Sequence, residues 1–153
     1  MKYEFGFSKL ILLASSIMGL VAFFLDFYQI NHLYTQWSGY DLLQFWYKKG
    51  FVLPIEAYAT GENWVQIGGW FLMLFPIVMG IIALELLIRS LFERFPVVHR
   101  VWFMATYCLL AFGVSWELSY MTNTSFYFFE LVDSGFWWSL AMVTWSFVAV
   151  WVD

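Results

Sequence analysis

The chain contains few charged residues. Asp, Glu, Lys and Arg together make up 12% of its 153 residues, whereas about 25% is usual for a soluble domain. Hydrophobic residues make up 63% of the chain, and the mean hydropathy is +0.74. Because a surface with so few charges cannot face water on all sides, the composition predicts an integral membrane protein.

Residue types that carry catalysis or bind metals are also scarce. The single cysteine, Cys108, cannot form an intramolecular disulfide and is interpreted as a small packing residue. The two histidines, His32 and His99, are expected on opposite sides of the membrane, where they cannot share one haem iron. The sequence contains no recognisable nucleophile–base pair, metal-binding motif or basic cluster for phosphates. It therefore predicts no enzyme, no metal, no cofactor and no nucleic-acid partner, and it leaves a bound lipid or pigment open.

The strongest membrane signal is the segment from Trp64 to Arg89, which carries no charge between Ile67 and Leu84. A helix rises ~1.5 Å per residue, so about 20 apolar residues cross a ~30 Å hydrocarbon layer. Pro76 lies near the middle of this segment and predicts a kink, which a membrane helix tolerates. One helical face is predicted to be the inner seam of a bundle, and its residues are Gly69, Met73, Pro76, Gly80 and Ala83.

Three further segments have the length and hydropathy of membrane helices. The predicted spans of a single membrane domain cover residues 10–27, 64–88, 97–118 and 135–152. The first is interpreted as an uncleaved span rather than a signal peptide. Small residues form one face of the first span, at Ser15, Gly19 and Ala22, and one face of the third, at Ala105, Cys108, Ala111 and Ser115. The sequence thus predicts an all-α fold, an antiparallel bundle of four transmembrane helices.

A short helix is predicted in the first outer loop. Ser38 and Asp41 have the spacing of a capping box, Lys48 and Lys49 fall in the last turn, and Gly50 follows. Its apolar content favours a helix that lies in the membrane interface.

The basic residues predict the orientation of the chain. Five of them lie near the N-terminus or between the second and third spans, and only Lys48 and Lys49 lie in an outer loop. By the positive-inside rule both termini are expected in the cytoplasm. The five residues on the inner side are Lys2, Lys9, Arg89, Arg94 and Arg100.

Acidic residues near the spans are the candidate ion sites. Glu85 lies well inside a predicted span, where a proton- or cation-coupled site would use a carboxylate. Arg89 follows four residues later, which favours instead a structural ion pair that reaches the headgroups. Asp26 and Glu117 fall at outer helix ends and could converge on a cation with Glu62 if the first and third spans are neighbours. The alternative is that each acid ends its span in water.

Aromatic residues make up 24% of the chain, and much of this content is typical of interfacial belts. The aromatic residues of the outer loops are denser than a belt requires, so they could also dock another membrane protein, a pigment or a lipid. The docking candidates are Trp37, Trp46, Phe128, Phe129, Trp137 and Trp138.

The layout resembles claudin-like tetraspan proteins, with four spans, cytoplasmic termini and a longer first outer loop. Trp37 and Trp46 occupy that loop, but the paired loop cysteines of the family are missing, which puts its disulfide-stapled extracellular sheet in doubt. The stretch from Trp37 to Leu42 is similar to small bacterial four-span membrane proteins. This resemblance implies a bacterial inner membrane and no particular activity.

These observations lead to two function hypotheses. The first is a non-enzymatic accessory or scaffold subunit of a larger complex, with the lipid bilayer and other integral membrane subunits as partners. The alternative is a small homo-oligomeric transporter or channel, for ions or coupled to protons, with Glu85 or the outer acids as its ion site.

Overall fold

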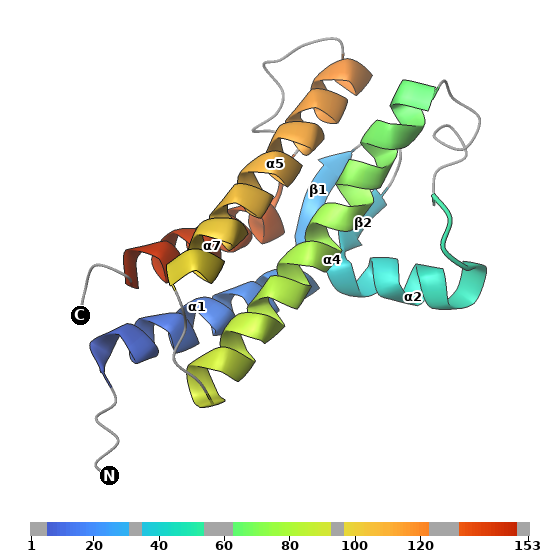
Figure 1. Ribbon diagram of the computed structural model, residues 1–153. Coiled ribbons are helices and arrows are strands. Elements are labelled where there is room, and N and C mark those ends of the chain that lie inside the picture. Colours follow the sequence, from blue (N-terminus) through green and yellow to red (C-terminus); the bar gives the residue numbers. More distant parts are fainter. Residues whose placement is uncertain (1–5, 31–34, 54–62, 93–96, 123–131, 150–153) are drawn as a thin grey trace.

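The computed structural model describes residues 6–30, 35–53, 63–92, 97–122 and 132–149 (Figure 1). These residues form helices and one two-stranded hairpin, joined by short irregular segments. The elements in chain order are α1 (Phe7–Phe24), β1 (Asp26–Ile30), β2 (Thr35–Ser38), α2 (Gly39–Lys49), α4 (Asn63–Phe92), α5 (Val97–Thr122) and α7 (Ser134–Val148).

Three of the described helices are long and apolar enough to cross a membrane, by length and composition. They comprise Phe7–Phe24, Gln66–Phe92 and Arg100–Ser119. The described part of α7 has 15 residues, which cover roughly 22 Å against a hydrocarbon layer of ~30 Å. The end of the predicted fourth span, at 150–152, lies outside the described residues. The integral membrane class is therefore supported, while the count of four spans stays a prediction.

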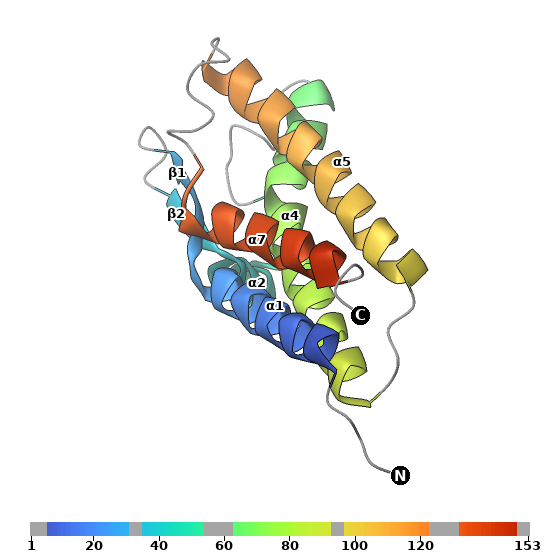
Figure 2. The same cartoon turned by 90° about the vertical axis from the view of Figure 1, so that its left-hand side faces the viewer.

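The four long helices form a closed ring. α1 packs against α4 and α7, and α5 packs against the same two helices. Neighbouring helices run in opposite directions (Figure 1), and α1 and α7 lie side by side in the turned view (Figure 2). The structure thus has the antiparallel packing that the sequence predicts.

The predicted inner seam is confirmed. Every residue of the predicted face of α4 is buried, and α4 continues as one helix through Pro76, so the kink stays a prediction. The small face of α1 is buried as well. At its centre, a Cβ on Gly19 would lie 2.7 Å from the Cβ of Ala83 and would also overlap Met142. Glycine therefore lets α1, α4 and α7 meet at one point.

An aromatic cluster fills the middle of the ring and is hereafter called the central aromatic cluster. Phe75 of α4 lies 5.7 Å from Phe27, 5.4 Å from Tyr107 and 5.2 Å from Phe136, measured between ring centroids. All four side chains are buried. Since they come from β1, α4, α5 and α7, the cluster joins four elements that are distant in the sequence.

The first predicted span ends too late, at residue 27. α1 ends at Phe24, where the N–H of Leu25 still bonds to Ala22, and the chain continues as strand β1. The extended backbone turns the fully buried Phe27 into the central aromatic cluster. An apolar run looks the same whether it continues a helix or enters the core as a strand, which explains the error.

Strand β1 pairs with two other segments of the chain. It pairs antiparallel with β2, with an irregularity between Asp26 and Tyr28. Tyr28 also forms an isolated bridge with Val132, and the N–H of Asp133 donates to the Phe27 carbonyl at 2.8 Å. A short sheet thus forms after α1 without a disulfide, in a segment where the sequence predicts only a short helix.

The predicted capping box of α2 is confirmed. The Asp41 N–H donates to Ser38 Oγ at 3.1 Å, and the Ser38 N–H donates to Asp41 Oδ2 at 3.3 Å. Lys48 and Lys49 occupy the last turn, and Gly50 ends the helix with φ of +85°. α2 packs on β2 and α4, and its place in the membrane interface stays a prediction.

Candidate functional site

Glu85 forms the ion pair that its spacing to Arg89 predicts. Arg89 Nε donates to Glu85 Oε1 at 2.9 Å, and the two side chains are 28% and 35% exposed, Arg89 being the less exposed. A partly exposed helix pair of this kind contributes about 0.3–0.5 kcal/mol. The geometry supports the structural interpretation of Glu85 over that of an ion site.

The structure does not group Asp26 with Glu117. Asp26 begins β1 after α1, whereas Glu117 lies on α5, which packs on α4 and α7. The acids that act on Asp26 are Asp133 and Asp41, and Glu62 lies outside the described residues. In the part of the chain that the structure describes, no three His, Cys, Asp or Glu residues are placed to hold a metal ion.

Asp41 and Asp133 cap helices, and their charges act on the neighbouring Asp26. Asp41 belongs to the capping box of α2, and Asp133 caps α7 by accepting from the Ser134 N–H at 2.6 Å. Both ends favour a negative charge because the helix dipole is positive there. Burial raises the pKa of the Asp26 carboxyl above its ordinary value, and the negative charges of Asp133 and then Asp41 raise it further.

Glu117 is the acid whose surroundings differ most from the prediction. The sequence predicts it at a helix end, either in water or beside a cation shared with Asp26 and Glu62, yet its side chain is only 1% exposed. Its Oε1 has no hydrogen-bond partner among the described residues. A Cβ added at Gly68 of α4 would overlap the carboxyl group. The sequence signal that could have revealed this contact is the glycine pair Gly68 and Gly69, of which only Gly69 was assigned to the seam.

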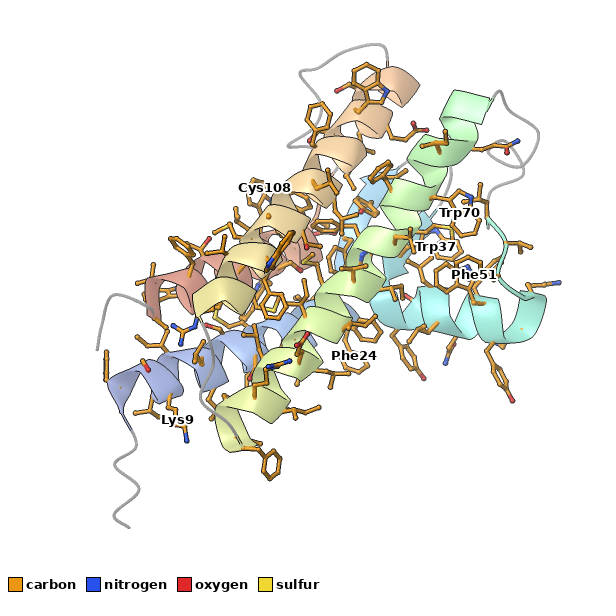
Figure 3. All side chains as sticks on the ribbon, in the orientation of Figure 1. Lys9, Phe24, Trp37, Phe51, Trp70 and Cys108 are labelled. Atoms are coloured by element: carbon orange, nitrogen blue, oxygen red, sulfur yellow. The ribbon has the colours of Figure 1, made fainter. Side chains whose placement is uncertain are left out.

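Trp37 of β2 and Trp46 of α2 take part in the aromatic contacts that pack α2 against its neighbours. Trp37 meets Phe45 of α2 edge-on, at 5.7 Å between centroids. Trp46 lies 4.5 Å from Phe51, which stacks on Trp70 of α4 at 4.7 Å. Figure 3 shows Trp37, Phe51 and Trp70 close together where α2 meets α4. Trp37 and Trp46 are half-buried by these contacts, and docking through their exposed parts stays a prediction.

The other docking candidates are only partly described. Trp137 and Trp138 lie on α7 and are 39% and 41% exposed, so both can reach a partner or lipid. Phe128, Phe129 and His32 lie outside the described residues, as does the side chain of His99.

The small face of α5 points outward. Cys108 and Ala105 are exposed, and Ala111 and Ser115 are half-buried; Figure 3 shows Cys108 on the outer side of α5. Cys108 is therefore exposed rather than packed within this chain, and the interpretation of it as a small packing residue is not supported by its own bundle. Helical spacing places these residues on one face, but lipid is as apolar as a protein interior, so the pattern does not say which way that face points.

Large side chains flank the small face on the same exposed side of α5. Trp102, Leu109, Phe112 and Trp116 are each about two-thirds exposed. Near the end of the helix a shallow groove of about 410 Å³ is lined by Phe112, Ser115, Trp116 and Ser119. We call this surface, from Val101 to Ser119, the outer face of α5. Its exposed side chains are uncharged, since the acid within this range, Glu117, is buried. The face combines a ridge of large residues with a strip of small ones.

Comparison of the chain with protein-family models, curated proteins and solved structures finds no match. No relative transfers an activity, ligand or partner to it, and the resemblance to claudin-like proteins stays a prediction. The candidate sites are therefore supported by the structure of this chain and by no relative.

Proposed function

We propose that this protein is a non-enzymatic accessory or scaffold subunit of a larger integral membrane complex. In this proposal it spans a bacterial inner membrane four times, with both termini in the cytoplasm. The observation that carries the proposal is the outer face of α5, where small residues are exposed although they would let another helix approach closely.

The occupant of this face is a transmembrane helix of another membrane protein. The face belongs to a candidate membrane span, and its exposed side chains carry no charge, so it suits an apolar helix at membrane depth. Helices associate in lipid through close van der Waals packing, because lipid tails are as apolar as the side chains and no hydrophobic force drives the helices together. The chain already uses this device internally, where Gly19 meets Ala83. The ridge of Trp102, Leu109 and Trp116 would then flank the partner helix.

The interior supports a scaffold over a transporter that works as a single chain. The central aromatic cluster is buried, and its side chains are in contact across the ring of helices. It therefore fills the centre, where a path for a transported ion would run. Glu85 is neutralised by Arg89. A homo-oligomeric transporter would instead place the outer face of α5 against a second copy.

Extraction from the native membrane in a mild detergent, followed by native electrophoresis and mass spectrometry, tests the proposal. The wild-type protein should migrate with larger subunits at fixed stoichiometry. Ala105→Phe fills the small strip and should release them, whereas the matched control Ala14→Phe, at an exposed alanine of α1, should retain them. A wild-type protein that runs alone or only with its own copies, or two variants that behave alike, would contradict the proposal.

A further inference from the structure

Glu117 is a carboxyl group buried where two helices touch. Its side chain is 1% exposed, and Oε1 has no hydrogen-bond partner within the described residues. Removing an ionised carboxylate from water without a partner costs many kcal/mol, so such a group takes up a proton and becomes neutral instead. Burial and the missing partner together favour the neutral acid.

The space around the carboxyl suits a proton rather than a metal ion. The carboxyl group occupies the volume that a Cβ on Gly68 would need, so α4 lies directly against it. Hard cations such as Ca²⁺ and Mg²⁺ need about six or more oxygen ligands at roughly 2.0–2.6 Å. The contact between α4 and α5 offers one carboxylate, and it is so close that a Cβ on Gly68 would already overlap the carboxyl group. The backbone carbonyls at this contact accept the hydrogen bonds of their own helices.

No charge from the neighbouring helices offsets Glu117 at close range. The described charged or titratable side chains on α4 and α5 are Glu85, Arg89, Arg100, Tyr107 and Cys108. Each is separated from Gly68 or Glu117 by at least nine or so residues of its own helix, which is roughly 14 Å of rise. α7, the other helix packed on α5, carries no charged side chain from Ser134 to Val148, and Asp133 caps its start.

We infer that Glu117 is a proton-binding site between α4 and α5, and that it takes no metal cation. The neutral acid fits against Gly68 and closes the contact between the two helices. Loss of the proton leaves a bare carboxylate there, and the contact opens so that water can reach it. This inference is independent of the proposed subunit role, because it concerns the inside of the bundle and not the outer face of α5.

Infrared spectroscopy of the purified protein in lipid nanodiscs tests the inference. Spectra from about pH 5 to about pH 9 span the range above the ordinary carboxyl values. The carbonyl band of a protonated carboxyl should persist at neutral pH in the wild type, fade as the pH rises, and be absent in Glu117→Gln. Glu85→Gln is the control and should retain the band. A wild-type carboxyl that ionises together with the exposed acids would overturn the inference.

Two further measurements protect the test against misfolding and against a bound cation. Gly68→Ala keeps the carboxyl but must displace it, so the band should shift toward that of a hydrated acid; a band that neither substitution changes overturns the assignment. Adding Ca²⁺ or Na⁺ at fixed neutral pH should leave the wild-type band unchanged. If either cation abolishes it, the site binds a metal ion, and the inference fails.

Hydrogen exchange tests the opening of the contact. At the alkaline end of the range, the amides of α4 around Gly68 should exchange several-fold faster in the wild type than in Glu117→Gln, and at the acidic end the two should agree. Equal exchange at every pH would show that the proton does not control the contact.

Discussion

At the scale of single residues, glycine and aspartate decide how closely elements approach one another. Gly19 lies where α1, α4 and α7 meet, and a Cβ there would lie 2.7 Å from that of Ala83. Asp26 lies where β1 leaves α1, between the acids that cap α2 and α7. Gly19 stabilises the contact between the three helices by its small size. Asp26 destabilises the folded state by its charge, which lies near those of Asp133 and Asp41.

Gly19→Ala is expected to lower the free energy of unfolding by about 1–3 kcal/mol, because overpacking a close contact forces the helices apart. Titration of the protein from mild micelles into sodium dodecyl sulfate, followed by circular dichroism, measures the change. Ala14→Val enlarges an exposed residue of the same helix and should leave the transition in place. An unchanged transition for Gly19→Ala would show that the three helices can separate at no cost.

Asp26→Asn is expected to stabilise the protein at neutral pH. Because the pKa of Asp26 is raised in the folded state, the folded state binds the proton more tightly than the unfolded state does. The stability of the wild type therefore falls as the pH rises from the ordinary carboxyl value of 3.8 through the raised value. Thermal unfolding of the variant should lack this fall. A variant that is less stable than the wild type at neutral pH would show that the charge of Asp26 is needed.

At the scale of elements, the sequence predicts where the helices lie better than which way their faces point. The span predicted over 64–88 is found as α4 (Asn63–Phe92), and the helix that starts at residue 97 is found as α5 (Val97–Thr122). Cap chemistry placed α2 correctly, because Ser38 and Asp41 act locally. These features depend on neighbours in the chain, so the sequence carries them.

The features that the sequence did not predict depend on distant neighbours. The strand at Asp26 forms because Phe27 enters a core built by α4, α5 and α7. The outward direction of Cys108 and the burial of Glu117 depend on how α5 is rotated in the ring. In a membrane protein, apolar residues cover both the interior and the lipid side, so hydropathy alone cannot fix that rotation.

Ser38→Ala is expected to cost about 0.5–2 kcal/mol in the stability of α2, because it removes the side chain that caps the helix. Hydrogen exchange of the α2 amides should accelerate, while the amides of α4 stay protected. Gln44→Ala, at an exposed position of α2, is the matched control and should change little. Equal acceleration in α2 and α4 would mean that α2 does not unfold as a local unit.

At the scale of the whole molecule, the central aromatic cluster makes the ring cooperative. Phe75 of α4 contacts aromatic rings from β1, α5 and α7, so one side chain links four elements of the ring.

Phe75→Ala is expected to lower the free energy of unfolding by about 3–5 kcal/mol, since it leaves a cavity that several elements line. The loss should appear in one transition shared by all four long helices, as measured by circular dichroism together with tryptophan fluorescence. Phe112→Ala removes a ring that is 68% exposed and should cost far less. Two separate transitions, or equal costs for the two variants, would contradict this role for the cluster.

The packing of α1 against α7 also means that α1 waits for its partner helix during synthesis of the chain. Gly19 contacts Met142, which the ribosome adds roughly 120 residues later. At roughly 5–20 residues per second, this interval lasts roughly 6–25 s. During that time α1 can pair with α4, but the side of α1 that will bind α7 has no cover from its own chain. Until synthesis reaches α7, that side of α1 therefore depends on cover from outside the chain.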